Sequence, residues 1–239
     1  MTTSSLRWFI SFVWLAAACA APPGCAVAPA GLTARYSFDE PGFRTATAKR
    51  VPGLVGSALS FDGVSQFAER PSSPEISFGE QDFTVELWVR TLETKRTRNF
   101  VDKRDERPRG YAVFVERGGH FGVQVASGEH HISTVVDRGR LGADGRWHHV
   151  AGVIKRLPPQ APALYVDGEL RASTGRLVPL ESIDSPATLW LGRHHRNGLV
   201  ARDEVYFGGS IDELAFYRRA LSAAEIKAIH AAGKAGKCR

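Results

Sequence analysis

The stretch GGSIDELAFYRRALS, residues 208–222, decides the fold class. Its first ten residues carry the polar and apolar alternation of a half-buried β-strand. Ser222 follows as a natural helix N-cap, and Glu225 three residues later completes a capping box. The chain therefore passes from a strand directly into one short helix near its C-terminus. The apolar stripe of this helix consists of Leu221, Ile226 and Ile229.

Short strands with the same period of two recur along the chain from residue 34 onward. The clearest is FTVELWVR, residues 83–90, in which every second residue is apolar. Turn signals such as Asp167-Gly168 separate the strands. Many short strands with regular turns predict an all-β sandwich. The tryptophans of three strands, Trp88, Trp147 and Trp190, are expected in its core.

Composition and charge set the class of protein. The chain has 239 residues, of which 43% are hydrophobic and 23% charged, which is enough for one sizeable core. Its net charge of +6 favours anionic partners such as acidic glycans, phosphorylated envelope polymers or lipid headgroups, whereas the plainer explanation is a soluble protein with extra arginine. There is no phosphate-binding loop, serine nucleophile elbow or dinucleotide fingerprint.

The N-terminus has the pattern of an export signal. Arg7 precedes an apolar run, residues 8–18, that is too short to span a membrane. We expect a signal peptide at 1–19, a Pro/Ala-rich tether at 20–30 and one domain at 31–239. LAAAC, ending at Cys19, is close to a bacterial lipobox, so either Cys19 carries lipid or the chain is simply secreted. Membrane contact is then expected only through that anchor, in the cell envelope.

Several blocks occur in the order of a known family: RYSFDE (35–40), ALSFDG (58–63), WHHVA (147–151), LYVDG (164–168) and the IDE of the opening stretch. Together they resemble the laminin-G-like, pentraxin-like branch of the concanavalin A-type jelly rolls, over nearly all of residues 32–232. The resemblance implies a two-sheet antiparallel jelly roll with one short C-terminal helix. It also implies a domain that binds rather than catalyses.

The resemblance further implies two sites. Its jelly rolls bring their termini together, so an exported chain with Cys25 and Cys238 at its ends is expected to form a disulfide between them. Relatives often hold Ca²⁺ where the first and last strands meet, and Asp39, Asp62 and Asp212 are the candidate ligands. The alternative is that these acids end strands or bond turns, and residues 41–49 lack the further acid that many relatives carry.

Catalysis of the kind known in this fold needs two carboxylates that alternate along one strand. Glu86 has no acidic partner two or four residues away, and Asp212 and Glu213 are neighbours whose side chains should diverge. His148 and His149 should likewise point to opposite faces, with one buried and the other exposed. The sequence thus predicts that the protein is not an enzyme.

Ligand contacts are expected on loops. Arginines cluster between residues 96 and 109, and a second loop begins with two histidines. Bidentate contacts from such a loop suit an anionic ligand, whereas the plain alternative is a solvated loop. The candidate ligand-binding residues are Arg104, Arg107, Arg109, His194 and His195.

The function predicted from the sequence is an exported binding module for a carbohydrate or a cell-envelope component. One alternative is a structural or protein-interaction domain of a surface complex. A glycan-active enzyme of the same fold is the third reading, and no nucleic-acid partner is expected.

Overall fold

The computed structural model describes residues 24–128, 132–139, 141–156, 161–174, 181–195 and 205–238. The predicted export signal, with Cys19, lies outside these ranges. Within them, no helix has the length and apolar character that a membrane crossing requires.

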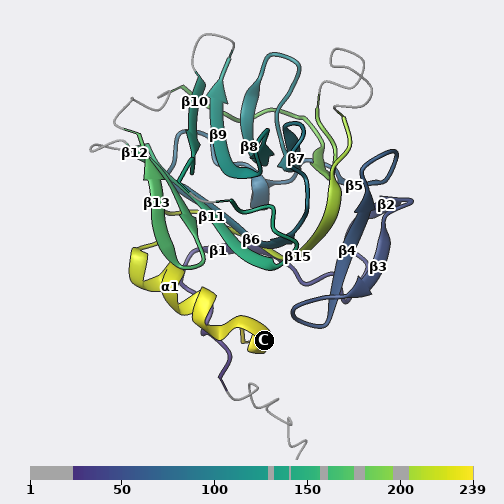
Figure 1. The fold of residues 1–239 in the computed structure, drawn as a ribbon. Helices are drawn as coiled ribbons and strands as arrows, with labels where there is room; N and C mark the ends of the chain where they lie inside the picture. The colour runs from purple at the N-terminus through teal and green to yellow at the C-terminus, as the bar shows by residue number, and fades with distance from the viewer. Residues whose placement is uncertain are drawn as a thin grey trace, which may run out of the picture.

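Two antiparallel sheets pack face to face, as the sequence predicts (Figure 1). Among the described residues, the larger sheet has eight strands and the smaller has seven. The larger sheet runs in the order β13 (Glu169–Ser173), β12 (Ala161–Val166), β11 (Trp147–Lys155), β6 (Phe83–Arg90), β15 (Gly208–Tyr217), β4 (Ser57–Asp62) and β3 (Lys49–Pro52), with β1 (Leu32–Tyr36) also paired to β15. The smaller sheet runs in the order β10 (Ile132–Val136), β9 (His120–Ser127), β8 (Arg109–Glu116), β7 (Arg98–Asp102), β14 (Leu189–Leu191), β5 (Phe67–Arg70) and β2 (Arg44–Ala46).

The core lies between the sheets and is rich in aromatic rings. Phe78 and Phe83 stack with their centroids 4.6 Å apart, and Tyr111 packs 5.3 Å from Phe83. The Tyr111 hydroxyl donates a 2.9 Å hydrogen bond to the carbonyl of Ile76, in the short 3₁₀ helix Pro74–Ile76, so its polar atom is satisfied. Alternate residues of the central strands fill the rest of this layer, which is why their sequences show the period of two.

The helix α1 (Ala223–Ala232) lies across the outer face of the larger sheet (Figure 1). The predicted capping box is present: Ser222 accepts from the Glu225 backbone N–H, and the Glu225 side chain accepts from that of Ser222. A short 3₁₀ turn, Gly233–Ala235, follows the helix. The helix buries its apolar stripe in a second, smaller hydrophobic cluster, which contains Ala151, Val153, Ala215, Tyr217, Leu221, Ile226 and Ile229.

The disulfide Cys25–Cys238 predicted from the family resemblance is confirmed, with the two Cα atoms 5.1 Å apart. Backbone hydrogen bonds reinforce it: Ala26 N–H donates to Gly236, and Cys238 N–H donates to Ala26. The two ends of the domain are thereby joined in a short parallel bridge, which fixes the residue between them, Lys237.

Lys237 enters a buried ionic network on the outer face of the larger sheet. Its Nζ lies 3.0 Å from Glu86 Oε1 and 3.3 Å from Glu213 Oε2, and all three side chains are at most 2% exposed. Arg35 pairs with Glu213 at 3.0 Å, and His149 Nε2 lies 3.0 Å from Glu86. Burial alone would raise the pKa of Glu86, but Lys237 and His149 outweigh it and hold that pKa below its ordinary value.

A β-bulge in β15 brings Glu213 into this network. The register shifts between Asp212 and Ala215, and Glu213 has a positive φ of 51°. The extra residue turns Glu213 to the same outer face as Asp212. The expectation that these two neighbouring side chains diverge is therefore wrong, because a bulge interrupts the strand alternation on which it rests.

Two expectations about aromatic residues also need correction. Trp88, Trp147 and Trp190 project from outer faces of the sheets and not into the layer between them. The residues on either side of Trp88 and of Trp190 fill that layer, and Trp147 pairs with Arg90, which shares the outer face of β6 with Trp88. His148 and His149 do point to opposite faces, but both are buried. His149 bonds Glu86, and His148 lies 5.8 Å from the Phe121 ring.

Replacement of Lys237 by Met should lower the free energy of unfolding by about 3–5 kcal/mol, because two buried carboxylates lose their cation. Urea denaturation measures this difference. Lys227→Met, on the exposed side of α1, is the matched control and should change stability by less than about 0.5 kcal/mol. Equal stability of the two variants would contradict the network's role.

Candidate functional site

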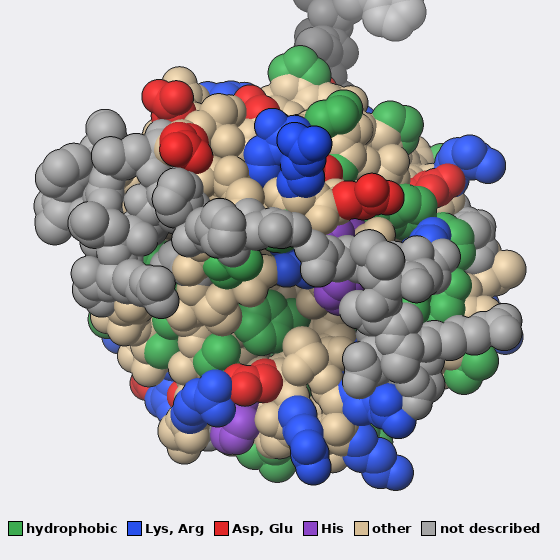
Figure 2. All heavy atoms as spheres, turned by 90° about the horizontal axis from the view of Figure 1, so that it is seen from above, with side chains coloured by type: hydrophobic (Ala, Val, Ile, Leu, Met, Phe, Trp, Pro, Cys, Tyr) green, Lys and Arg blue, Asp and Glu red, His purple; other side chains and the backbone are tan. Residues whose placement is uncertain are grey.

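One row of cross-strand partners runs across the whole outer face of the smaller sheet. These residues face away from the core, because Ala68, Leu191, Val113 and Val123 beside them face into it. Paired side chains on one face have Cβ atoms about 5 Å apart. The side of the molecule opposite to the helix is seen in Figure 2, where His, hydrophobic and basic side chains lie close together. From edge to edge the row is Arg44, Glu69, Trp190, Asp102, Ala112, Gln124 and Thr134.

An aromatic platform occupies one half of this row. Phe67 lies 5.5 Å from Trp190 and 6.2 Å from Tyr206, and all three rings are only partly buried. Arg193 rests on the platform, with its guanidinium carbon 4.3 Å from the Trp190 centroid and 4.9 Å from that of Phe67. Arg193 makes no ion pair with any described carboxylate. The platform thus presents rings and a cation that lacks an anionic partner in the described part of the chain.

A buried polar cluster adjoins the platform. Asp102 is fully buried and takes a bidentate pair from Arg104, whose Nε and Nη2 both lie 2.8 Å from its oxygens. Asn99 donates to it at 2.6 Å, and the His195 backbone N–H and Nδ1 lie 3.0 Å away. Arg104 also donates a hydrogen bond to the Gln124 side chain. It thereby spans the small side chain of Ala112, which lies between Asp102 and Gln124 in the row.

The charge of Asp102 is fixed by these contacts. Burial alone would raise its pKa, but Arg104 and His195 outweigh burial and hold that pKa far below its ordinary range. Asp102 is therefore a permanent carboxylate that neither gives nor takes a proton near neutrality. His195 Nδ1 faces this carboxylate. Its other nitrogen, Nε2, is buried and has no hydrogen-bond partner in the described structure.

The ligand atoms of Asp102, His194 and His195 lie within 4.8 Å of one another, which is close enough for a metal ion. Two observations argue against that fit. The His194 and His195 rings stack at 4.5 Å with an interplanar angle of 20°, so their in-plane lone pairs run side by side and do not converge. The carboxylate oxygens are already bonded to Arg104 and Asn99.

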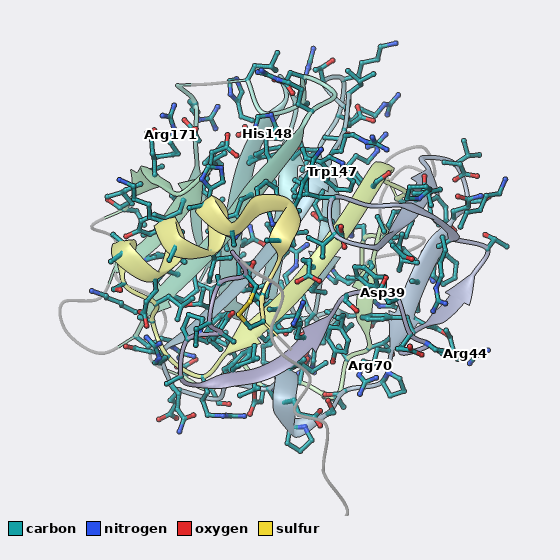
Figure 3. All side chains as sticks on the ribbon, turned by 90° about the horizontal axis from the view of Figure 1, so that it is seen from below. Asp39, Arg44, Arg70, Trp147, His148 and Arg171 are labelled. Atoms are coloured by element: carbon teal, nitrogen blue, oxygen red, sulfur yellow. A yellow bond between two sulfur atoms is a disulfide. The ribbon has the colours of Figure 1, made fainter. Side chains whose placement is uncertain are left out.

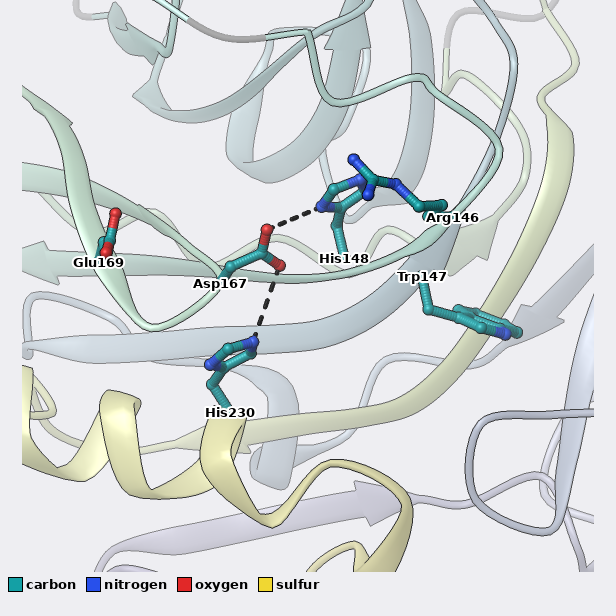
Figure 4. A pocket seen from close by; sticks show the side chains of 6 residues that line it. All are labelled: Arg146, Trp147, His148, Asp167, Glu169 and His230. Atoms are coloured by element: carbon teal, nitrogen blue, oxygen red, sulfur yellow. Dashed lines mark hydrogen bonds and ion pairs between the residues drawn. The ribbon is translucent and has the colours of Figure 1, made fainter.

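A pocket of about 390 Å³ lies between α1 and the β12–β13 hairpin (Figure 4). His148 is held between two carboxylates there: its Nδ1 is 2.8 Å from Asp167 and its Nε2 is 2.9 Å from Asp144. Because both ring nitrogens face carboxylate acceptors, these hydrogen bonds favour the imidazolium form of His148 and raise its pKa. His230 of the helix lies 4.0 Å from Asp167. These polar groups satisfy one another, so the pocket mainly joins the helix to the sheet.

The three predicted calcium ligands do not converge. Asp39 and Asp212 both reach the turn between β3 and β4, where Asp39 accepts from Ser57 N–H and Asp212 accepts from Val55 N–H. Asp62 lies at the other end of β4, about 17 Å away by strand length. There it accepts three backbone N–H bonds from its own turn, residues 64–66.

Two glycines of the β3–β4 turn let the carboxylates of Asp39 and Asp212 approach its backbone. A Cβ at Gly53 would lie 2.5 Å from an Asp212 oxygen, and one at Gly56 would lie 2.4 Å from an Asp39 oxygen. The carboxylates therefore pack directly against the turn. Calcium binding stays a prediction, and only Asp39 and Asp212 of its three proposed ligands lie at one place.

The three arginines predicted to bind a ligand from this loop have different environments in the structure. Arg104 is buried against Asp102, so the expectation of an exposed loop cation is wrong for it. Arg109 begins β8 and pairs with Asp105 at 2.9 Å. Arg107 is exposed. His194 and His195, the other predicted ligand contacts, lie beside Asp102, the partner of Arg104.

Sequence reasoning missed the platform. The signal was present in LWL (189–191), where Trp190 stands between two leucines and must face away from them. Phe67 on β5 and Tyr206 before β15 reach it through strand pairing of distant segments, namely β5 with β14 and the bridge between Arg193 and Tyr206. No local pattern indicates that pairing.

Comparisons with known proteins agree with this architecture. The family profile of the concanavalin A-like lectin/glucanases superfamily matches residues 62–227. A search of curated proteins finds no match to the sequence.

Similar solved structures are toxin binding domains. That of Paraclostridial Mosquitocidal Protein 1 is 15% identical, with a TM-score of 0.62, over 79% of this chain and 47% of that one. The botulinum neurotoxin serotype D ligand-binding domain in complex with N-acetylneuraminic acid is 13% identical, with a TM-score of 0.61, over 79% and 45%. That of serotype G is 12% identical, with a TM-score of 0.60, over 83% and 50%. This chain therefore spans about half the length of these structures, and the likeness concerns the fold.

Replacement of Arg104 by Ala should lower the free energy of unfolding by about 3–5 kcal/mol, because it leaves the buried Asp102 carboxylate without its cation. Arg107→Ala is the control from the same segment and should be within about 0.5 kcal/mol of the parent. Urea denaturation of both variants measures the difference. A parent-like Arg104→Ala would show that the pair is not structural.

Replacement of His148 by Gln should destabilise by about 1–3 kcal/mol at low pH and by less at high pH. The raised pKa of His148 means that its stabilisation is complete below its ordinary value of 6.5 and is lost as pH rises through the folded-state pKa. Melting temperatures at about pH 5.5 and pH 8.5 test this difference.

His230→Gln is the control for that experiment. Burial lowers the pKa of His230, so this histidine costs stability as pH falls, and its replacement should show the opposite pH trend. Identical trends for the two variants would contradict the assignment of His148 as the charged histidine.

Proposed function

This chain belongs to the concanavalin A-like lectin/glucanases superfamily, and on that premise we propose that it is a non-catalytic carbohydrate-binding module. The binding face is the outer face of the smaller sheet. The observation that carries this proposal is the partly exposed platform of Phe67, Trp190 and Tyr206 beside a buried polar cluster. Apolar rings with a few fixed polar groups are what a sugar, with its apolar ring faces and hydroxyl edges, requires.

Arg193 extends the proposal to acidic sugars. Its guanidinium lies on two rings and pairs with no described carboxylate, so a carboxylate of the ligand can supply the missing partner. The serotype D structure, of the same fold, was solved with N-acetylneuraminic acid, which is an acidic sugar. This parallel supports the proposal only as a likeness of fold.

Binding without hydrolysis is favoured by the state of the carboxylates. Asp102 and Glu69 flank Trp190 on the same face, about 10 Å apart by strand spacing, which is near the separation in inverting glycosidases. Asp102 is buried and both its oxygens are bonded to Arg104, so it can neither protonate a leaving group nor activate the water that such hydrolysis needs. Glu213 and Asp212 lie on the other sheet, with side chains at most 1% exposed.

We also propose that the protein is exported, as its sequence predicts. The disulfide supports this proposal, because such bonds persist in oxidising compartments. Lipid attachment at Cys19 stays a prediction.

Glycan-array screening followed by calorimetry tests the binding face. Trp190→Ala should weaken binding of the best glycan at least about tenfold, whereas Trp190→Phe, which keeps a ring, should retain most of it. Arg193→Ala should weaken acidic glycans only, and Arg117→Ala, at the exposed β8–β9 turn, is its charge-matched control. Parent-like binding by a folded Trp190→Ala variant would refute the proposed face.

A further inference from the structure

Several loops gather at one end of the sandwich, where β4 and β6 end and β15 begins. Backbone hydrogen bonds hold them together: Gly118 N–H donates to the Thr94 carbonyl, and Gly145 N–H donates to the Thr91 carbonyl. The Thr91 hydroxyl also donates to the carbonyl of Gly208 in β15, at 2.7 Å. We call this end the loop tip, and it comprises residues 63–66, 91–97, 117–119, 137–139 and 141–147.

Three exposed apolar side chains stand on the loop tip. Leu92 is 74% exposed, Val64 is 72% exposed and Leu141 is 47% exposed. Val64 belongs here because Gly63, beside it, donates its N–H to the carbonyl of Phe207. These three are half of the large hydrophobic side chains that are exposed in the described part of the chain. Exposed apolar groups gathered in one place mark contact with another protein or with a membrane.

Trp147 adds an aromatic ring to the loop tip. It is partly buried at the start of β11, opposite Arg90 of β6. The exposed Arg90 side chain has its guanidinium carbon 5.0 Å from the Trp147 centroid. Figure 3 shows Trp147 beside the helix on the outer face of the larger sheet. A tryptophan ring next to a cation is what the interface between a membrane and water favours.

Partly or fully exposed basic side chains outnumber acidic ones on and directly beside the loop tip, among the described residues. The acids are Asp62, Glu93, Glu116 and Asp144, and the bases are Arg90, Lys95, Arg96, Arg117, Arg138 and Arg146.

Each of these acids is already bonded within the fold. Asp62 accepts three backbone N–H bonds from its own turn, which keep it ionised and hold its pKa at about 2. Glu93 accepts from two backbone N–H groups of its own loop. Glu116 pairs with one arginine of the loop tip, at 2.9 Å, and Asp144 with another, at 2.6 Å. By contrast, Arg90 and Lys95 form no ion pair with a described carboxylate.

We propose that the loop tip docks on the surface of an anionic phospholipid membrane. The side chains of Leu92, Val64 and Leu141 enter the boundary between headgroups and acyl chains, and Trp147 lies at the level of the headgroups. Arg90 and Lys95 bind lipid phosphates.

A membrane suits the loop tip better than a protein partner does. The core of a protein interface is depleted of charged residues, whereas here cations stand on the same loops as the apolar side chains. The contact is also separate from the lipid anchor predicted at Cys19. The Cys25–Cys238 disulfide, where the described chain begins and ends, lies beside the β3–β4 turn at the other end of β4.

Co-sedimentation with vesicles tests this proposal. Residues 24–239 are used, because both sheets, both hydrophobic clusters and the disulfide lie within them and form one folding unit. The protein should bind vesicles of phosphatidylcholine mixed with phosphatidylglycerol, and bind phosphatidylcholine alone at least about tenfold more weakly. Leu92→Ser/Leu141→Ser should weaken binding to the mixed vesicles at least about tenfold. Arg90→Ala/Lys95→Ala should do the same and make binding less dependent on salt.

Matched controls come from surfaces away from the loop tip. Val27→Ser/Leu32→Ser removes exposed apolar groups at the opposite end, where Leu32 pairs with Tyr217 at the far end of β15. Lys155→Ala/Lys227→Ala removes two exposed charges from β11 and α1. Both controls should bind like the parent. Absence of parent binding to the mixed vesicles, or equal weakening by the loop-tip variants and their controls, would overturn the proposal.

Tryptophan fluorescence locates the contact. Lipids brominated in their acyl chains should quench the parent, and Trp147→Phe should lose most of that quenching, because Trp147 is the tryptophan of the loop tip. Trp190→Phe should retain it, which separates this contact from the platform on the smaller sheet. Quenching that is lost with Trp190→Phe and kept with Trp147→Phe would place the membrane contact on the platform and refute the loop tip.

Discussion

The buried contact between Lys237 and the carboxylates of Glu86 and Glu213 is the constraint on which the larger sheet depends. Glu86 lies on the central strand β6, Glu213 on β15, and Lys237 in the tail after the helix. Buried carboxylates are tolerated only when a cation accompanies them, so the tail must return to the sheet. The disulfide Cys25–Cys238 and the Ala26 bridge hold the tail there. The helix, enclosed between β15 and this tail, is thereby fixed on the sheet.

The smaller sheet also contains a buried carboxylate that is paired with a cation. Asp102 is buried on its outer face and satisfied by Arg104, Asn99 and His195. Because these contacts hold its charge, Asp102 takes no part in proton transfer. It is a fixed, buried carboxylate next to Trp190. A binding face needs such rigidity, because groups that are already ordered lose little entropy when a ligand arrives.

The fold could be predicted from the sequence because its signals are local or come from a resemblance. Strand alternation in 83–90, the capping box at Ser222 and the ordered family blocks each correspond to an observed element. The site could not be predicted to the same degree. The placement of Trp190 beside Asp102 is a register relation between β14 and β7, nearly ninety residues apart in the chain. The bulge that turns Glu213 outward has no local signature, and it overturned the alternation argument.

Arginine shows most clearly what sequence leaves open. Arg104, Arg109, Arg90 and Arg193 look alike in the chain, and a cluster in one loop drew attention to the first two. In the structure Arg104 and Arg109 have carboxylate partners, whereas Arg90 and Arg193 rest on tryptophan rings and pair with no carboxylate among the described residues. A paired guanidinium has little left to offer a ligand, since its charge is already compensated, while a cation on an aromatic ring is positioned and still uncompensated. The net charge of the chain therefore says less about binding than the few cations that the fold leaves unpaired.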